Sequence, residues 1–385
     1  MKKKIKIAML IDGWTPIFWW WQIHVNELCK WLINNYYCNI DLYVRKLKND
    51  KWLKFDKDEI LLNWKLKIFK IWPITKFFNI FWRILSLINT IIYLLIKTKK
   101  EKYNIIHAYS YVSWLPAIIV WKICNIPVVY TVLWANNIDL KKKWFLVKIE
   151  KWLLTWIKYD LEISVFKSFF KHRNINKNIV VIHNGVDILK FNKAKVLHKY
   201  EWFNLLRVWR FNREKGVKYL IKWVALINKD LLKKNKFKLN LVWDWILFEE
   251  MRKLSLLLWI NEFINFKWKL YWESLIKEYI KNHVFILPSL AEWQPLTILE
   301  AFASKIPVIA TNVWDNKYFI KDNNWFLIKP EDKYEIKNVI EKVLKKDSIE
   351  LLELWKNWYD FIKNSCTWDI MVDKVFSEYV KLINL

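Results

Sequence analysis

Short apolar runs, rich in β-branched residues, alternate along the whole chain with longer stretches of helical periodicity. Strands that alternate with helices predict parallel sheets covered by helices on both faces. The first set of predicted strands covers 4–12, 39–44, 104–109, 127–132, 161–165 and 178–183, and the second covers 205–208, 238–243, 263–266, 284–289, 307–311 and 325–330. Two such sets indicate an α/β protein with two doubly wound domains.

A polar stretch separates the two sets and predicts the domain boundary. It follows the Asn-Gly-Val-Asp sequence at 184–187 and continues to about residue 201. We therefore predict an N-terminal domain over 1–185 and a C-terminal domain over 186–365, which agrees with the number of domains expected for 385 residues. The end of the chain, 369–385, has apolar residues near a 3.6-residue spacing and predicts one helix.

Two apolar segments bear on location. The N-terminal one is too short for a signal peptide and lacks a small-residue cleavage site, so we predict a buried strand and a cytoplasmic protein. The segment 77–96 is long enough to span a bilayer, but Asn79, Arg83 and Asn89 interrupt it. We interpret it as a partly buried amphipathic helix that lies on the inner face of the plasma membrane. A helix buried within its domain is the alternative.

The unusual feature of the composition is 29 Trp against 3 Gly. Average usage predicts about 27 glycines in a chain of this length. Trp and Gly together number 29 plus 3, or 32, so their sum is ordinary and the division between them is inverted. The pattern indicates that many glycines are encoded by UGA codons that are read here as tryptophan. A truly Trp-rich protein is the alternative.

The positions of the tryptophans favour recoding. Trp14 and the run 19–21 crowd the connection between the first predicted strand and the following helix. Such connections favour Gly, Asn and Asp, and glycines there would let the backbone approach a phosphate. Further tryptophans at predicted turns and strand ends are Trp209, Trp243, Trp245, Trp268, Trp293, Trp314 and Trp325. Trp82 and Trp368, in helical patterns, are the candidates for genuine tryptophans.

The charge balance favours anionic partners. Lys and Arg number 65 against 37 Asp and Glu, a formal charge of +28, which suits nucleic acid, an anionic membrane surface or a phosphorylated substrate. A genome bias towards Lys, Asn and Ile explains the excess equally well. The usual nucleic-acid-binding motifs do not occur, so we expect no nucleic acid partner. The four cysteines lack metal-ligand spacing and are predicted to be reduced thiols.

The segment 284–314 carries the most informative pattern, because a strand, a loop, a helix and a second strand follow one another. Pro295 suits the first turn of the helix, where its missing N–H is not needed. The N–H groups of Leu296 and Thr297 would then be free to bind a phosphate, with support from the helix dipole.

Two glutamates accompany this helix. Glu292 lies just before it, and Glu300 lies eight residues further on, about two turns deeper on a nearby face. One carboxylate could bind a sugar hydroxyl and the other a ribose hydroxyl. Taken alone, a helix cap and a solvated surface acid would explain the same two residues.

This segment, with its E-x7-E spacing, resembles the signature of the retaining GT-B glycosyltransferases of family 4. Residues 208–216, VWRFNREKG, resemble the family's VGRL…KG segment, and 181–191 resemble the VIPNGVD motif that opens the second domain. The resemblance implies that Arg210 and Lys215 contact the donor diphosphate, a role that suits two cations. Ordinary solvated side chains are the alternative.

Several single positions extend the resemblance. If the tryptophans are glycines, Trp20 and Trp21 fall in the family's N-terminal Gly-Gly loop, and Trp293 is the glycine of its EG-x-P-L motif. His107 matches a family histidine and would line the cleft, with a packed core histidine as the alternative. Leu133 stands where the family usually has a histidine that contacts the donor sugar.

The resemblance implies a GT-B fold, in which two Rossmann-like, doubly wound parallel-sheet domains face a central cleft and 366–385 return as a helix to the first domain. It implies transfer of a sugar from a nucleotide-diphosphate sugar to an acceptor hydroxyl with retention, in cell-envelope glycan or glycolipid synthesis. Glu292 would hold the donor sugar and, with His107, would be catalytic, whereas Glu300 would hold the ribose.

No Asp-x-Asp pair follows a suitable strand, so we expect neither a metal nor another cofactor. Cationic side chains and helix N-termini would meet the diphosphate charge instead. The basic, apolar segment 65–100 indicates a glycan or lipid-linked acceptor at a membrane surface. A GT-B nucleotide-sugar epimerase and a non-catalytic sugar-nucleotide- or membrane-binding relative are the alternatives, and Leu133 favours the second of these.

Overall fold

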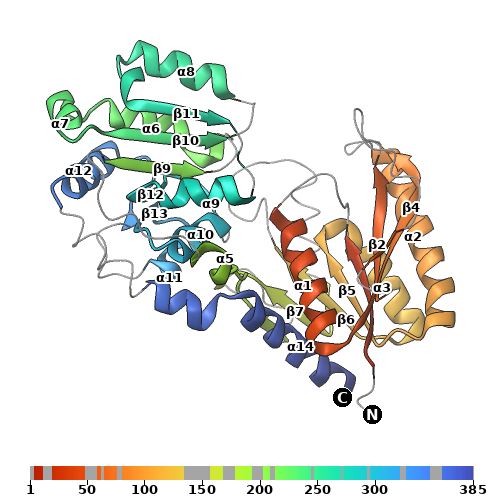
Figure 1. The fold of residues 1–385 in the computed structure, drawn as a ribbon. Helices are drawn as coiled ribbons and strands as arrows, with labels where there is room; N and C mark the ends of the chain where they lie inside the picture. Colours follow the sequence, from red (N-terminus) through yellow and green to blue (C-terminus); the bar gives the residue numbers. More distant parts are fainter. Residues whose placement is uncertain are drawn as a thin grey trace. The chain divides into compact units, whose positions relative to one another are not determined.

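The chain folds into two compact units, Met1–Asn184 with Trp368–Leu385 (unit 1) and Gly185–Thr367 (unit 2). Each unit is built on its own sheet, as the computed structural model in Figure 1 shows. The residues that the structure describes are 4–11, 20–47, 59–61, 65–75, 80–133, 157–167, 178–192, 203–208, 213–243, 247–268, 270, 272–292, 295–320, 327–346 and 358–384.

Unit 1 is built on an eight-stranded sheet. Its strands are β1 (Lys6–Ile11), β2 (Asn39–Leu47), β3 (Glu59–Leu61), β4 (Leu66–Thr75), β5 (Ile105–Tyr109), β6 (Val128–Val132), β7 (Leu161–Ser164) and β8 (Ile179–Val181). They lie in the order β3-β4-β2-β1-β5-β6-β7-β8, and all neighbours are parallel except β3 with β4. The order reverses between β1 and β5, the type of switch point at which open α/β sheets bind ligands.

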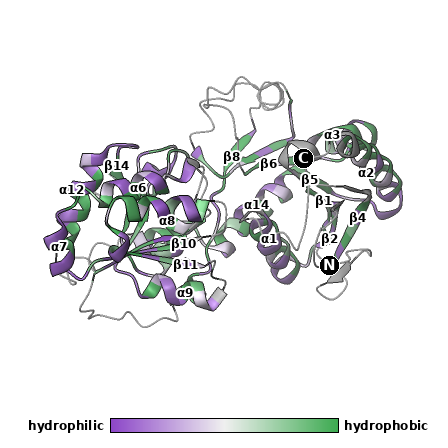
Figure 2. Cartoon of the chain, turned by 90° about the horizontal axis from the view of Figure 1, so that it is seen from above, coloured by the Kyte–Doolittle hydropathy of each residue, from purple (hydrophilic) through white to green (hydrophobic). Residues whose placement is uncertain are grey.

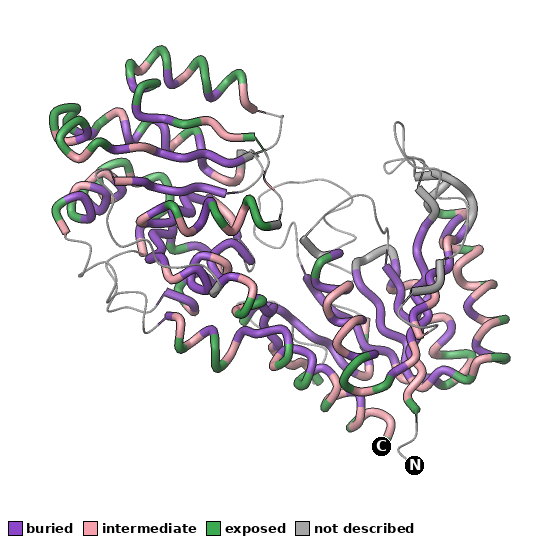
Figure 3. Tube along the Cα trace, viewed as in Figure 1, coloured by how far each residue is buried: buried purple, intermediate pink, exposed green. Residues whose placement is uncertain are grey.

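Helices cover this sheet. They are α1 (Trp20–Tyr36), α2 (Ile80–Glu101), α3 (Ser110–Cys124) and the C-terminal α14 (Trp368–Asn384). β5 and β6 are buried at every residue, which explains their continuous apolar sequences (Figure 3). The last helix packs beside α1, where the rings of Tyr36 and Phe376 stack with their centroids 3.8 Å apart. The end of the chain is therefore part of unit 1.

Unit 2 is built on a six-stranded parallel sheet. Its strands are β9 (Asn204–Val208), β10 (Lys238–Trp243), β11 (Ile264–Trp268), β12 (Val284–Leu287), β13 (Val308–Thr311) and β14 (Leu327–Ile328). The order β11-β10-β9-β12-β13-β14 reverses between β9 and β12. Its helices are α5 (Ile188–Asn192), η2 (Arg213–Lys215), α6 (Val217–Val224), α7 (Lys229–Lys234), α8 (Phe248–Leu257), η4 (Asn261–Phe263), α9 (Trp272–Ile280), α10 (Leu296–Ala303), α11 (Asn316–Phe319) and α12 (Lys333–Leu344).

Every strand predicted from the sequence has a counterpart in these sheets, and the two parallel-sheet α/β units confirm the predicted fold class. The sequence analysis missed β3 and β4. The β4 sequence alternates apolar residues with lysines and contains Pro73, so it lacks the continuous apolar run of a central parallel strand. Figure 2 shows that the helices of both units carry hydrophilic as well as hydrophobic residues. Among the described helices, none is long and apolar enough to cross a membrane.

Candidate active site

The connection after β9 contains a glycine that no other residue can replace without rearrangement. Gly216 has φ +67° and precedes the first residue of α6. A Cβ atom at this position would lie 1.8 Å from the carbonyl oxygen of Pro288, which follows β12. The connections after β9 and β12 therefore touch through their backbones, at the point where the strand order of unit 2 reverses.

This approach joins two residues that the sequence analysis singled out. Lys215 Nζ lies 2.9 Å from Glu292 Oε1, and the two side chains are 14% and 4% exposed. The hydroxyl of Ser289 donates to the same carboxylate oxygen at 2.7 Å. A buried carboxylate requires partners of this kind. The sequence analysis did not identify Ser289, because a serine after a strand carries no distinguishing signal.

Beneath this pair, Arg207 occupies the middle of the unit 2 sheet. Its side chain is completely buried in β9, and Nη2 donates to the carbonyl oxygen of Lys215 at 3.3 Å. Its Nε and Nη1 have no hydrogen-bond partner among the described residues. Burial lowers the pKa of Arg207 to about 10, and the negative charge of Glu292 opposes the shift. The sequence analysis missed this residue, although an arginine inside the apolar run LLRV is a visible signal.

The second glutamate lies further along α10. Glu300 Oε2 accepts a hydrogen bond of 2.8 Å from the hydroxyl of Tyr279, a fully buried residue of α9. Burial raises the pKa of Glu300, while the Tyr279 hydrogen bond and the charge of Lys190 act in the opposite direction. Tyr279 is a further residue of the site that sequence reasoning missed.

The start of α10 provides hydrogen-bond donors near Glu292. The helix begins at Leu296, and Pro295 is its N-cap rather than a residue of its first turn. No side chain among the described residues caps the start of the helix. The buried hydroxyl oxygen of Thr297, Oγ1, also has no hydrogen-bond partner among the described residues. Free donors at a helix N-terminus suit an anion such as a phosphate.

Four predicted site residues cannot be placed in full. Arg210 and Trp293 lie outside the described residues. Trp20 and Trp21 begin α1, but only their backbone is described. The predicted roles of these four residues stay predictions.

His107 lies in the interior of unit 1. It is completely buried in β5, where its Nδ1 pairs with the hydroxyl of Tyr379 and its Nε2 lies 2.6 Å from Thr131 Oγ1. Burial holds the pKa of His107 well below its usual value. Hydrogen bonds on both ring nitrogens favour the alternative of a packed core histidine, and its catalytic role stays a prediction. Leu133, at the end of β6, is also buried.

Comparison with known proteins gives consistent results. Residues 190–361 match the family described as glycosyl transferases group 1. The UDP-Gal:alpha-D-GlcNAc-diphosphoundecaprenol alpha-1,3-galactosyltransferase of Escherichia coli is 28% identical over 321 residues, which cover 74% of this chain and 77% of that protein.

Two solved structures show how far the fold is shared. Sucrose-phosphate synthase from Thermosynechococcus elongatus has a TM-score of 0.79 at 18% identity, over 99% of this chain and 100% of that chain. HepE of Anabaena, in complex with UDP and glucose, has a TM-score of 0.73 at 15% identity, over 97% of this chain and 99% of that chain.

The matched residues include the Lys215–Glu292 ion pair and the Tyr279–Glu300 hydrogen bond of unit 2. The structural likeness covers both units and concerns their fold. The chain thus has a GT-B fold, and its residues 190–361 are similar to the glycosyl transferases group 1.

Proposed function

We propose that the protein transfers a hexose from a nucleotide-diphosphate sugar to a hydroxyl of a lipid-linked glycan, with retention of the anomeric configuration, in cell-envelope glycan synthesis. The observation that carries the proposal is the ion pair of the partly buried Lys215 with the buried Glu292 at the switch point of unit 2, beside the uncapped start of α10. The HepE complex with UDP and glucose supports a uridine diphosphate donor. The Escherichia coli relative supports a polyprenyl diphosphate-linked acceptor and galactose as the first sugar to test.

In this proposal the diphosphate binds to Lys215 and to the N–H groups at the start of α10. When the bond between the sugar C1 and the diphosphate oxygen breaks, negative charge develops on the leaving diphosphate, and both groups stabilise it. The acceptor oxygen bonds to C1 on the same face, and its proton passes to the leaving phosphate. Glu292 orients the sugar and Glu300 the ribose, and neither a metal nor another cofactor takes part.

The proposal includes glycine at many of the tryptophan positions. Trp259 and Trp314 have φ values of +55° and +46°, in the left-handed region that favours glycine. Trp259 follows the last turn of α8, where helices commonly end in a left-handed glycine, and its side chain is 77% exposed. Peptide mass spectrometry of protein from its native host tests this directly. Tryptophan at both positions would refute recoding there.

The decisive experiment for the function is a donor and acceptor screen. Purified protein is incubated with UDP-galactose or UDP-glucose, with and without a polyprenyl diphosphate-linked N-acetylglucosamine, and UDP release and the product anomer are measured. We expect UDP release only with acceptor and an α-linked product from an α-linked donor. An epimerised donor without acceptor would indicate the epimerase, and UDP binding without turnover would indicate a non-catalytic binder.

Variants separate turnover from binding. Glu292→Gln is expected to abolish turnover while the protein still binds UDP, because the carboxylate acts on the sugar. Glu300→Gln is expected to weaken UDP binding, because it acts on the ribose. The matched control is Glu250→Gln on α8, whose carboxylate forms an exposed ion pair with Lys218 of α6, and it should change neither property. Equal activity in all three variants would refute the proposed roles.

A further inference from the structure

One face of α2 is apolar, and none of the described elements covers it. Ile84, Ile88, Ile92 and Ile96 expose 54%, 47%, 52% and 51% of their surfaces. Residues four apart lie one above another on a helix, so these side chains form a ridge about 18 Å long, which we call the isoleucine ridge. Other residues of α2 pack against α3 and β4. The helix is therefore half-buried, as the amphipathic interpretation predicted, and the fully buried alternative is wrong.

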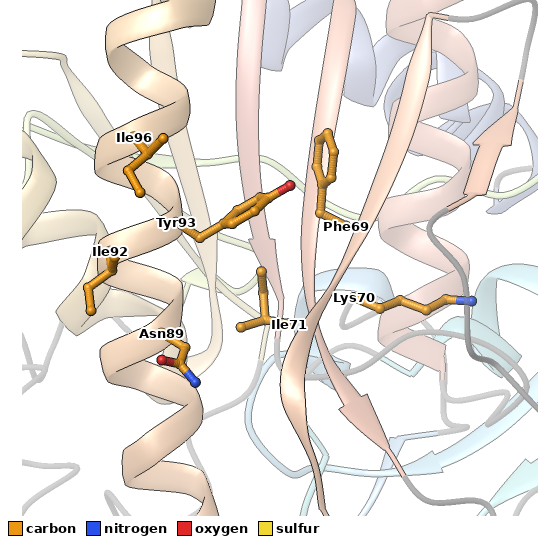
Figure 4. Close-up of a pocket in the computed structure, with 7 residues that line it drawn as sticks. All are labelled: Phe69, Lys70, Ile71, Asn89, Ile92, Tyr93 and Ile96. Carbon is orange, nitrogen blue, oxygen red and sulfur yellow. The ribbon is translucent and has the colours of Figure 1, made fainter.

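A pocket of about 340 Å³ lies next to the ridge, between α2 and β4. Its lining residues are Phe69, Lys70, Ile71, Asn89, Ile92, Tyr93 and Ile96. In Figure 4, Tyr93 points from the helix towards Phe69, and Lys70 points away from the helix. The ammonium group of Lys97 lies 4.8 Å from the Phe69 ring centroid and 5.7 Å from that of Tyr93, so a cation adjoins this mainly apolar pocket.

The sequence from 62 to 100 carries positive charge only, and Glu101, which ends α2, pairs with Lys6. From 62 to 100 there is no Asp or Glu. The cations of this stretch are Lys65, Lys67, Lys70, Lys76, Arg83, Lys97, Lys99 and Lys100. Lys99 and Lys100 are exposed in the last turn of α2. An apolar ridge with flanking cations matches the two layers of an anionic bilayer surface, which has acyl chains below phosphate headgroups.

We propose that the isoleucine ridge and its adjoining pocket dock on a bilayer of anionic phospholipids, with the ridge among the acyl chains, one chain in the pocket and the lysines at the headgroups. Such a patch on a soluble chain otherwise marks a protein interface. A second copy fits less well, because a symmetric contact would bring the same cations face to face. The proposal depends on the proposed function in one respect, namely that docking would place the enzyme near a lipid-linked acceptor. Binding to vesicles can be measured without any sugar transfer.

The ridge is tested by cosedimentation with phosphatidylcholine vesicles that contain or lack phosphatidylglycerol, at low salt. We expect binding to the anionic vesicles, and at least ten-fold weaker binding for the double variant Ile88→Asn with Ile92→Asn. The matched control is Leu256→Asn with Leu257→Asn, which changes two leucines of α8 that are 51% and 76% exposed. The control should bind like the unmodified protein. Equal binding by the ridge variant, or no binding of the unmodified protein, would overturn the proposal.

The charge is tested in the same assay. Lys99→Glu with Lys100→Glu should weaken binding by at least about five-fold per lysine, the usual contribution of a basic residue near an anionic membrane. Lys233→Glu with Lys234→Glu, an exposed pair in the last turn of α7, makes the same change in net charge and should have little effect. Equal loss in both pairs would show attraction by net charge alone. A dimer in ultracentrifugation that the ridge variant abolishes would assign the surface to a second copy. Either result overturns the proposal.

A second inference concerns Arg207, and it rests on the proposed function. The buried Arg207 and the partly buried Lys215 carry two positive charges and the buried Glu292 one negative charge, so these three side chains have a net formal charge of +1. A buried guanidinium with unpartnered donors is unfavourable unless another charge compensates for it. We infer that Arg207 is a positioning residue: it holds the Lys215 carbonyl in its turn and adds positive potential beneath the diphosphate site.

The test compares UDP with uridine, which lacks the charge. Arg207→Met should weaken UDP binding at least ten-fold and change uridine binding less than two-fold, whereas Arg207→Lys should retain part of the preference. Arg252→Met, on α8, is the surface control. If the role of Arg207 is purely structural, Arg207→Met should weaken the binding of UDP and of uridine to the same extent. Alternatively, the thermal midpoint of Arg207→Lys should fall as far as that of Arg207→Met. If the unmodified protein does not bind UDP, the proposed function fails. If Arg207→Met keeps the preference for UDP, only this inference fails.

Discussion

The contact between Gly216 and Pro288 leads to the sharpest prediction, because backbone atoms lie on both sides of it. Gly216→Ala adds a Cβ atom that would meet the Pro288 oxygen at 1.8 Å and the Pro288 carbonyl carbon at 2.8 Å. No side-chain rotation can relieve a backbone overlap. The connection that carries Ser289 and Glu292 must therefore move, and the carboxylate would move away from Lys215.

Two costs add in this variant. The left-handed φ of +67° costs an alanine about 1–2 kcal/mol. Ordinary contact begins at 3.4 Å, so the Pro288 oxygen must shift by the difference from 1.8 Å, or 1.6 Å. Overpacking of this kind costs about 1–3 kcal/mol. We therefore expect a loss of about 2–5 kcal/mol in the free energy of unfolding, a large fraction of the stability of a typical domain.

Urea unfolding measures the stability change, and UDP titration measures the effect on the site. Gly216→Asn separates the two costs, because Asn tolerates the left-handed region but still carries a Cβ. If overlap dominates, the Asn and Ala variants lose similar stability and both lose UDP affinity at least ten-fold. An alanine variant that loses less than about 1 kcal/mol and binds UDP normally would refute the reasoning, since the left-handed backbone alone accounts for that much.

Three further predictions concern other parts of the chain. In protein produced with tryptophan at position 259, Trp259→Gly should stabilise the fold by about 1 kcal/mol, because it relieves a left-handed tryptophan, and an unchanged or lower urea midpoint would contradict this. Burial lowers the pKa of His24 from 6.5 to about 4, so between these pH values the folded protein binds fewer protons than the unfolded chain. The free energy of unfolding is therefore unaffected by His24 above pH 6.5 and falls by about 3 kcal/mol as the pH is lowered from 6.5 to 4. His24→Gln should reduce this pH dependence of stability, and an equally steep profile would refute the assignment. Lys215→Met should cost about 3 kcal/mol, because Glu292 loses the ammonium group that lies 2.9 Å from its Oε1 and keeps the charge of Arg207 nearby. Adding Glu292→Gln should recover part of that loss in a double-mutant cycle, and strictly additive effects would show that the pair is not coupled.

The elements of the fold followed from local patterns, apart from one region. Continuous apolar runs such as those of β5 and β6 are typical of strands covered on both faces, and they were recognised as strands. β4 was missed because its alternating lysines suit a strand near the edge of a sheet. In α2 the sequence showed an amphipathic helix, but only its packing against α3 and β4 decided that, among the described residues, nothing covers the isoleucine ridge.

The site was predictable in its motifs and not in its contacts. Glu292, Glu300 and Lys215 could be named because the spacing within each motif is short and resembles a known signature. The arginine within the LLRV run was visible in the sequence, but its contact with the Lys215 carbonyl depends on which turn lies above β9. The same holds for His107, whose partner Tyr379 belongs to the last helix.

The sequence by itself determined the two sets of strands, the basic apolar segment and the motif residues, because the periodicity of side chains and the chemistry of short motifs are local properties. Only the tertiary structure decided which charges meet. Lys215 and Glu292 are far apart along the chain, and they pair because the strand order reverses between β9 and β12 and Gly216 lets two backbones touch. Burial then makes that pairing necessary, since a carboxylate removed from water must find its cation within the protein.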